Sequence, residues 1–350
     1  MKILAFSTRD SQVMQAFFAL PRQVYTGDPA WVPQSEAAVA NLLRQNGDQS
    51  DELAGLAFVQ PLLAVDEASG APLARAIAIL HPGARDEIGR RLGYIGGFEC
   101  LADHEAAGRA VLEQAEGLLR AQGAATIQAP RIDNMQMGLV IEGHHLPQTV
   151  GTPHNPPYYA AILQALGYQV REELYTYIFD RSCAIQLPFR VPGIQTRTFD
   201  RAYLEREVSI FHHLQQAIFQ SHPGWLPRTL AEDRQMIEGY LPVLDDELVI
   251  IAEDRAGQAM GLLVCLPDVD QAMRGQAVDN ARLISIGALP AVAHKGVGVM
   301  MGLHLMRNLL AKGYQTLEGS WVRDSNIAPQ NLARRFKGRR GRVFAVFEKG

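Results

Sequence analysis

The fold of this chain is decided by residues 281–321, which read ARLISIGALPAVAHKGVGVMMGLHLMRNLLAKGYQTLEGSW. The pattern predicts a buried strand at Arg282–Leu289, a largely apolar helix at His294–Lys312 and a second strand at Thr316–Trp321. Two glycines, Gly296 and Gly298, open the helix. Glycines there let a ligand approach the backbone, and the free N–H groups and the helix dipole favour an anion such as a phosphate. The stretch is therefore predicted to hold an anionic group.

The turn Ala293-His294-Lys295-Gly296-Val297-Gly298 resembles the signature of the GNAT superfamily, the acetyl-CoA-dependent N-acetyltransferases. That signature is Gln/Arg-x-x-Gly-x-Gly/Ala, and the chain departs from it at Ala293. The resemblance implies that acetyl-CoA or another acyl-CoA binds at the end of the first strand, at the turn and near an asparagine further on. The residues assigned in this way are Ile286, Gly287, Ala288, Leu289, His294, Lys295, Gly296, Val297, Gly298, Val299 and Asn326.

Two other phosphate-binding motifs can be compared with the same turn. A P-loop requires Gly-Lys-Ser/Thr, and this tripeptide does not occur in the chain. A dinucleotide fingerprint requires a third glycine where Met301 stands, although Glu318 lies at a tolerable distance for the acidic residue of that motif. A nucleotide-dependent enzyme therefore remains open as an alternative.

Length and composition limit the class of protein. At 350 residues the chain is long enough for two domains, and its net charge of −4 gives no reason to expect nucleic acid. The three cysteines lack metal-ligand spacing, and no apolar stretch approaches the ~20 residues that cross a bilayer. We expect a cytoplasmic protein, a monomer or homodimer, with no bound metal and no nucleic-acid or membrane partner.

The chain also repeats itself at an offset of about 190 residues. Gly96, His104, Gly108 and Gly123 fall on Gly287, His294, Gly298 and Gly313, and Asn134 falls close to Asn326. Each copy is predicted to contain a strand, two helices, a hairpin, a strand, a helix, a strand, a helix and a closing strand, at Leu174–Asp180 in the first copy and Arg342–Glu348 in the second. This order resembles the GNAT fold. It predicts a mixed α/β protein of two tandem GNAT-like acyl-CoA N-acyltransferase domains, at residues 1–182 and 193–350.

The two copies differ at the cofactor turn. Where the second copy has Lys295 and Gly296, the first has Glu105 and Ala106. A methyl group keeps a diphosphate away from the backbone and a carboxylate repels it, so only the second copy is predicted to bind acyl-CoA. The first copy is predicted to be a degenerate relative that shapes the acceptor site, in a cleft shared by the two copies.

The first copy also resembles a group of bacterial GNAT-like proteins of uncertain substrate. Three motifs carry this resemblance, Asp28-Pro29-Ala30-Trp31-Val32-Pro33, Gly96-Gly97-Phe98-Glu99 and Asn155-Pro156-Pro157-Tyr158-Tyr159. Glu99 stands on an otherwise apolar strand, where a carboxylate must be paired or line a cleft. Glu99, Tyr158 and Tyr159 are therefore predicted to contact the substrate, an amine of an unidentified small molecule or peptide.

Acyl transfer to an amine requires a base that removes a proton from the amine. Glu318, Asp324 and Ser285, the last through a water, are the candidates near the turn. The resemblance implies a tyrosine as general acid in the helix after Asn326, but residues 326–336 contain no tyrosine. A non-catalytic acyl-CoA-binding or interaction protein of the same fold therefore remains the alternative.

Overall fold

The structure, a computed structural model, describes residues 1–44, 56–134, 136–183, 189–220, 222 and 224–350. The chain divides into two compact units. The N-terminal unit comprises Met1–Glu173, Pro223–Leu226 and Val343–Gly350. The C-terminal unit comprises Leu174–His222 and Pro227–Arg342. Within the described residues no helix is both long and apolar enough to span a membrane.

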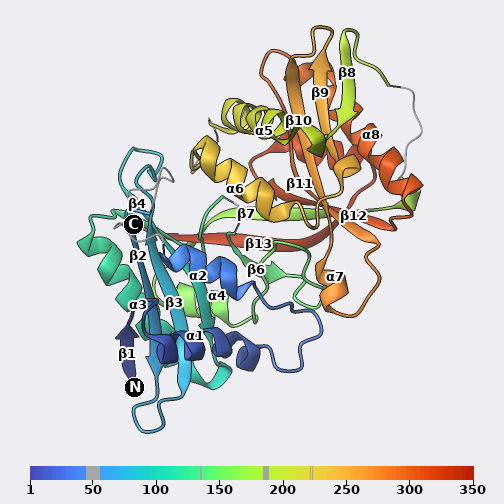
Figure 1. Cartoon of the computed structure of the whole chain (residues 1–350). Helices are drawn as coiled ribbons and strands as arrows, with labels where there is room; N and C mark the ends of the chain where they lie inside the picture. Colours follow the sequence, from blue (N-terminus) through green and yellow to red (C-terminus); the bar gives the residue numbers. More distant parts are fainter. Residues whose placement is uncertain (45–55, 135, 184–188, 221, 223) are drawn as a thin grey trace. The chain divides into compact units, whose positions relative to one another are not determined.

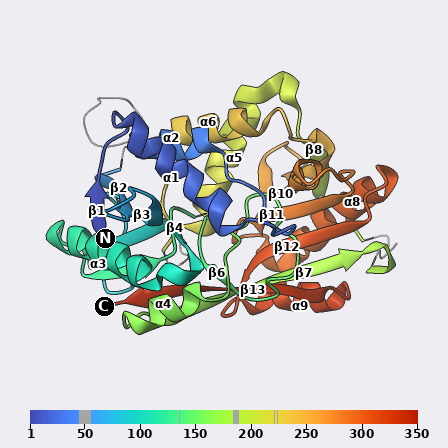
Figure 2. The ribbon, with the colours of Figure 1, turned by 90° about the horizontal axis from the view of Figure 1, so that it is seen from below.

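The N-terminal unit is a mixed sheet with helices on both faces (Figures 1 and 2). Its strands pair antiparallel, except that β4 and β5 run parallel and separate after Tyr94 and Gln128. The strand order is β1 (Lys2–Ala5), β2 (Phe58–Val65), β3 (Pro72–Leu80), β4 (Leu92–Cys100), β5 (Thr126–Ala129) and β13 (Arg339–Lys349), with β6 (Leu139–Glu142) also on β13. Of β13, the residues from Val343 onward belong to this unit. Its helices are α1 (Ser11–Val24), α2 (Glu36–Arg44), α3 (Glu105–Ala121) and α4 (Tyr159–Ala165).

Strand alternation explains the two layers of apolar contacts in this unit. Successive side chains of a strand point to opposite faces of the sheet. On β2, Leu63 packs with the core beneath α1 and α2, whereas its neighbour Leu62 packs with the core beneath α3. Because both faces are covered, β2 and β3 read as nearly continuous apolar runs.

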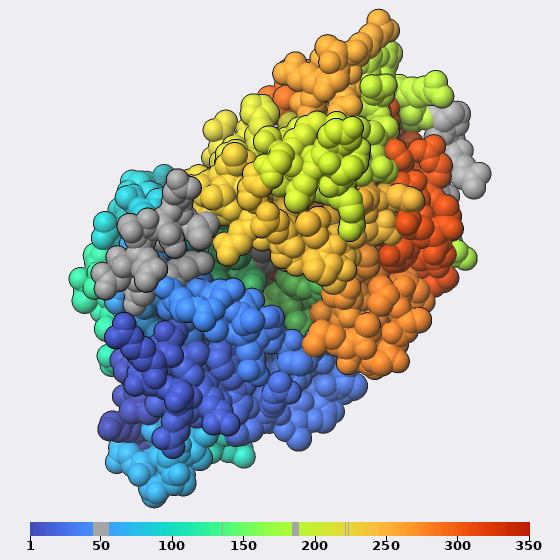
Figure 3. Space-filling model, in the orientation of Figure 1, coloured from blue at the N-terminus to red at the C-terminus, as the bar shows by residue number. Residues whose placement is uncertain are grey.

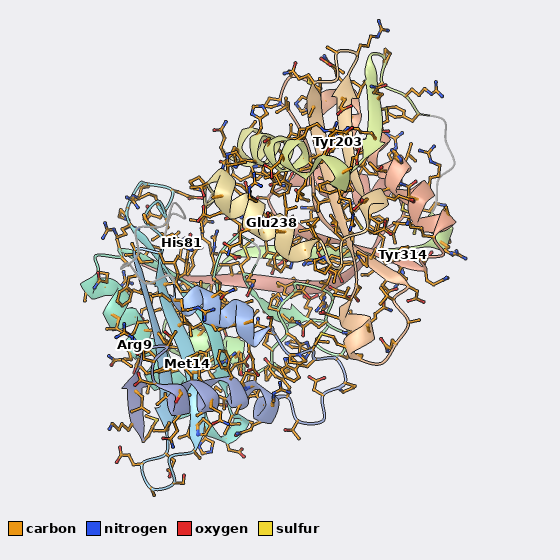
Figure 4. All side chains as sticks on the ribbon, in the orientation of Figure 1. Arg9, Met14, His81, Tyr203, Glu238 and Tyr314 are labelled. Carbon is orange, nitrogen blue, oxygen red and sulfur yellow. The ribbon has the colours of Figure 1, made fainter. Side chains whose placement is uncertain are left out.

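The C-terminal unit repeats this plan. The sheet order is β8 (Ile194–Thr198), β9 (Val249–Asp254), β10 (Ala259–Pro267), β11 (Asn280–Ala288), β12 (Thr316–Arg323) and β7 (Gln169–Asp180). Helices α5 (Leu204–Phe219) and α6 (Leu230–Tyr240) cover one face and form its front surface in Figure 3, and α8 (Val297–Ala311) covers the other. Short helices α7 (Asp270–Met273) and α9 (Ile327–Arg335) complete the unit. Met14 on α1 and Glu238 on α6 mark the equivalent helical layers (Figure 4).

The two-copy α/β fold predicted from the sequence is confirmed. β4, α3 and β5 of the N-terminal unit correspond to β11, α8 and β12 of the C-terminal unit. The paired glycines after the helices, Gly123 and Gly313, have φ angles of 83° and 86°, a left-handed conformation that favours glycine at a helix end.

The two closing strands are exchanged, and here the sequence prediction is wrong. Residues 174–180, predicted to close the first copy, belong to β7 and pair with β12 in the C-terminal unit. The last strand, predicted to close the second copy, pairs through Phe347 with Ala129 of β5 in the N-terminal unit. After a duplication the free edges of β5 and β12 are equivalent, so a local apolar pattern does not specify which edge a strand joins.

Candidate functional site

The strands of the C-terminal unit separate beside the predicted cofactor turn. β11 and β12 pair in parallel from Asn280 and Thr316 to Leu283 and Gly319, and the pairing stops there. β11 continues to Ala288 with β10 as its partner, and its residues 284–288 are half-buried. The helix α8 begins nine residues after β11 ends. An open strand end and a helix N-terminus therefore lie at the same edge of this sheet.

The glycines of the turn have different local roles. Gly296 precedes α8 with φ 85° and ψ 14°, and a Cβ atom there would lie 2.6 Å from Cζ of Phe189. A Cβ atom on Gly298 would meet only Cδ1 of Ile286, at 3.8 Å. Gly296 is thus required by the backbone, whereas Gly298 leaves the first helical turn accessible. His294 and Lys295 are exposed on the short turn before it.

Side chains at the end of β11 contact helices on both faces of the sheet. Ile286 and Ala288 pack against the core beneath α8. On the other face, Ser285 Oγ accepts a hydrogen bond of 3.1 Å from Gln215 on α5. Gly287 leaves room for Ile218 of the same helix, because a Cβ atom there would lie 2.5 Å from Ile218 Cγ2. The helix α5 therefore lies across the open end of β11.

One turn before Gln215, α5 carries a histidine held by a buried carboxylate. His212 Nδ1 is 2.8 Å from Asp233 Oδ2, and Arg228 Nε donates to the other oxygen of Asp233 at 2.5 Å. Asp233 is fully buried, whereas 28% of the His212 side chain is exposed. A carboxylate that orients an imidazole in this way prepares it to accept a proton. This pair could not be predicted, since it depends on how α6 packs on α5.

Two of the predicted bases, Glu318 and Asp324, have partners other than those described at the open end of β11. Glu318 is buried, accepts a hydrogen bond of 2.8 Å from Ser320 Oγ and lies 3.4 Å from Arg342 Nη2. Ser320 in turn accepts from Nε of Arg282, whose pKa is lowered by burial to about 10. Glu318 is thus a counter-ion between two buried arginines. Asp324 is exposed and accepts from the backbone of Ser325 at 2.7 Å.

The predicted cofactor residue Asn326 precedes α9. Its side chain makes no capping hydrogen bond to that helix, and its backbone N–H donates to Arg323. The residue at the equivalent place in the first copy, Asn134, holds the backbone of Leu226 through both its amide atoms, at 2.8 and 3.0 Å. The roles of Asn326, Glu318, Asp324 and Ser285 in binding or catalysis stay predictions.

In the N-terminal unit the three motifs of the first copy meet at one place. His154 Nε2 is 2.8 Å from Asp28 Oδ2 of the first motif. Tyr25 shares its one hydroxyl proton between the backbone oxygen of His154 and Oε2 of Glu99, each at 2.9 Å, and stacks on Trp31 with ring centroids 4.8 Å apart. Asn155 accepts a hydrogen bond of 2.7 Å from the backbone of Val140. These contacts fix the loop that leads into Tyr158 and Tyr159.

Glu99 lies at the centre of this arrangement. Its Oε2 atom accepts hydrogen bonds from Tyr25 at 2.9 Å and Tyr159 at 2.8 Å, and Arg75 Nη2 lies 3.9 Å from Oε1. Burial raises the pKa of Glu99 to about 7, against the lowering effects of Arg75 and the two tyrosines. Tyr158 donates to the backbone of Cys100 instead, at 2.6 Å. Glu99 is therefore paired, as a carboxylate on an apolar strand requires.

Because the pKa of Glu99 is raised in the folded chain, its effect on stability depends on pH. Between its ordinary value of 4.5 and about 7, the folded chain keeps a proton that the unfolded chain has lost. The free energy of unfolding then falls as pH rises, by at most about 1.4 kcal/mol per pH unit. We expect the stability of Glu99→Gln relative to the unmodified chain, measured by urea denaturation, to increase by about 1 kcal/mol from pH 6 to pH 7.

Asp270 provides a control for this measurement. Burial raises its pKa from 3.8 to about 6. Its contribution to the free energy of unfolding therefore decreases mainly as pH rises from 3.8 to about 6. The corresponding stability difference for Asp270→Asn should therefore change by only about 0.4 kcal/mol from pH 6 to pH 7 and be flat above that. Equal pH dependence of the unmodified chain and Glu99→Gln would contradict the assignment to Glu99.

Two curated relatives match almost the whole chain, and no family model matches it. Protein YghO of Escherichia coli is 24% identical over 96% of this chain and 92% of its own length. The bacterial ceramide synthase of Caulobacter vibrioides is also 24% identical, over 96% of this chain and 94% of its own.

Solved structures with a similar fold also span the chain. A tandem GNAT protein from the clavulanic acid biosynthesis pathway has a TM-score of 0.62, at 11% identity over 99% of this chain and 98% of that one. A GCN5-related N-acetyltransferase from Sphaerobacter thermophilus has a TM-score of 0.59, at 14% identity over 99% and 95%. A probable N-acyltransferase from Enterococcus faecalis has a TM-score of 0.61, at 13% identity over 99% of this chain and 71% of that one.

Proposed function

We propose that this chain, which carries the GNAT fold twice in tandem, transfers an acyl group from acyl-CoA to an amine. The observation that supports this most directly is the separation of β11 and β12 beside the N-terminus of α8 in the C-terminal unit. In the N-terminal unit the equivalent strands also separate, but α3 begins with Glu105 in its first turn. There Gly108 is crowded, since a Cβ atom would lie 2.9 Å from Cys100 Sγ.

The residues of the C-terminal turn fit the diphosphate of CoA. At Gly298 only Cδ1 of Ile286 lies within 4 Å of where a Cβ atom would be, so little covers the first turn of α8 there. The backbone N–H groups of that turn have no acceptor within the helix. Exposed Lys295 and His294 add donors beside it. In this proposal the diphosphate contacts the backbone of Val297, Gly298 and Val299. CoA, when bound, supplies the thioester whose acyl group is transferred.

The acceptor proposed is an amphiphilic amine. The Caulobacter relative is named for making ceramide, which is an amide of a fatty acid and a long-chain amino alcohol. Forming such an amide requires the amine nitrogen to attack the thioester carbonyl carbon and the carbon–sulfur bond to break. The acyl group then resides on nitrogen and CoA leaves as its thiol.

We propose that His212 accepts the proton that the attacking amine loses. Asp233 orients this imidazole, and Gln215 on the same helix contacts Ser285 at the open end of β11. The backbone N–H groups at that strand end are the donors proposed for the oxyanion that forms on the carbonyl oxygen. Ser285, Glu318 and Asp324 are the alternative bases predicted from the sequence.

The test is release of CoA thiol from purified full-length chain, acyl-CoA of several chain lengths and a panel of amines. We expect thiol release that depends on the amine, and His212→Gln to lower kcat by about 100-fold or more. Neighbouring His213 is exposed, so His213→Gln is the matched control and should keep full activity. Affinity for CoA should be the same in both variants.

Two results would contradict the proposal. CoA binding without thiol release from any acyl-CoA and amine would identify a non-catalytic acyl-CoA-binding protein. Thermal stabilisation by NAD or ATP, with none by CoA, would identify a nucleotide-dependent enzyme. If thiol is released but His212→Gln retains full kcat, the assignment of the proton to His212 is wrong.

A further inference from the structure

A pocket opens in the N-terminal unit beside Arg75 and Glu99. Its apolar lining is formed by Phe18 and Pro21 of α1, Val39 of α2, and Trp31 and Pro33 from the loop between these helices. Arg22, Gln34 and Glu36 add polar groups to the lining. Arg75 of β3 and Glu99 of β4 also line it. The pocket therefore combines a hydrocarbon surface with a buried pair of opposite charges.

Arg75 is held in place but is incompletely paired. Only 3% of the residue is exposed, its guanidinium lies over the Phe17 ring at 4.5 Å, and Nη1 donates to the backbone oxygen of Phe17 at 2.9 Å. Its Nε atom is buried and, among the described residues, has no hydrogen-bond acceptor. A buried donor without an acceptor costs about 1–3 kcal/mol. This orphaned donor in a pocket indicates that a ligand supplies the acceptor.

Glu99 offers the complementary group. Both tyrosine hydroxyls donate to Oε2, whereas Arg75 Nη2, at 3.9 Å, is beyond hydrogen-bond distance from Oε1. Within the described part of the chain no residue donates a hydrogen bond to Oε1. A ligand that satisfies both residues must therefore carry a donor and an acceptor close together, next to hydrocarbon.

We infer that this pocket binds an amphiphilic amino alcohol, with its amine donating to Glu99 Oε1, its hydroxyl accepting from Arg75 Nε and its alkyl chain against the apolar lining. A fatty acid is disfavoured because its carboxylate would meet that of Glu99. That this ligand is the acyl acceptor rests on the proposed function.

Titration calorimetry with the full-length chain at pH 8 tests the inference. The probes are a twelve-carbon 2-amino alcohol, dodecylamine and dodecanoate, each below its micelle concentration. We expect the amino alcohol to bind more tightly than dodecylamine and dodecanoate not to bind. In Glu99→Gln the two tyrosines retain an oxygen acceptor while an amide N–H replaces Oε1, so amino-alcohol affinity should fall about 10-fold or more.

Two further variants test the apolar lining without changing Arg75 or Glu99. Val39 is half-buried and lines the pocket, whereas Ala38, beside it on α2, is exposed. Val39→Glu should weaken amino-alcohol binding by a similar factor, and Ala38→Glu should leave it unchanged. Tighter binding of dodecanoate than of the amino alcohol, or equal binding of the amino alcohol to the unmodified chain and all three variants, would overturn the inference.

Titration of CoA into the same samples separates this inference from the proposed function. Glu99→Gln and Val39→Glu should bind CoA as the unmodified chain does, because the CoA turn belongs to the C-terminal unit. If CoA binds and the amino alcohol does not, the pocket assignment fails alone. If the amino alcohol binds as described but CoA does not, the proposed function fails and the pocket stands.

Discussion

Gly298→Asp is expected to abolish CoA binding while leaving the C-terminal unit folded. A Cβ atom at this position has room, and a carboxylate in the first turn of a helix is favourable to the helix dipole. The same carboxylate would lie beside the diphosphate. At about 4 Å and an effective dielectric constant of about 20, two like charges repel by about 4 kcal/mol, so affinity should fall at least about 100-fold.

Gly302, on the same helix, is the matched control for that measurement. A Cβ atom there has no heavy atom within 4 Å, so Gly302→Asp adds the same charge one turn further from the predicted diphosphate site. Calorimetry should show near-normal CoA affinity for Gly302→Asp, with thermal melting points of both variants close to that of the unmodified chain. Full CoA affinity in Gly298→Asp would rule out the turn as the cofactor site. Gly296 is a poor test, because any side chain is strained at its φ of 85°.

Glu318→Ala is expected to destabilise the C-terminal unit by about 3–5 kcal/mol. The change leaves Arg282 and Arg342, both buried, without the carboxylate between them. The measurement is urea denaturation at pH 7, and the control is Asp324→Ala, which removes an exposed carboxylate from the next loop and should cost little. If Glu318→Ala instead keeps its stability and loses acyl transfer, Glu318 is the catalytic base predicted from the sequence.

Much of the fold could be predicted from local patterns. The glycine turn, the strand before it and the apolar helix after it lie close together in sequence, and their repetition indicates a duplicated α/β domain. The exchange of β7 and β13 could not be predicted, because each of these strands is compatible with two equivalent sheet edges. Whether a closing strand pairs with Gly319 of β12 or with Ala129 of β5 depends on contacts across the whole chain.

The residues of the candidate sites also divide into those that the sequence indicated and those that only the fold brings together. Gly298 and Glu99 could be selected from the sequence, one by its motif and the other by its charge on an apolar strand. His212 and Asp233 lie 21 residues apart on different helices. Arg75 becomes a candidate binding residue only because the fold places it next to Glu99. Such pairs arise from tertiary packing, which a single sequence does not encode in any local pattern.

The exchanged closing strands also bear on how such a duplicated protein evolves. Neither half of the coding sequence specifies a complete sheet, because each half supplies the closing strand that pairs with β5 or β12 of the other. Deleting either copy would leave the sheet of the other with an unpaired edge prone to aggregation. Folding of either copy therefore depends on the presence of the other, whatever each copy binds.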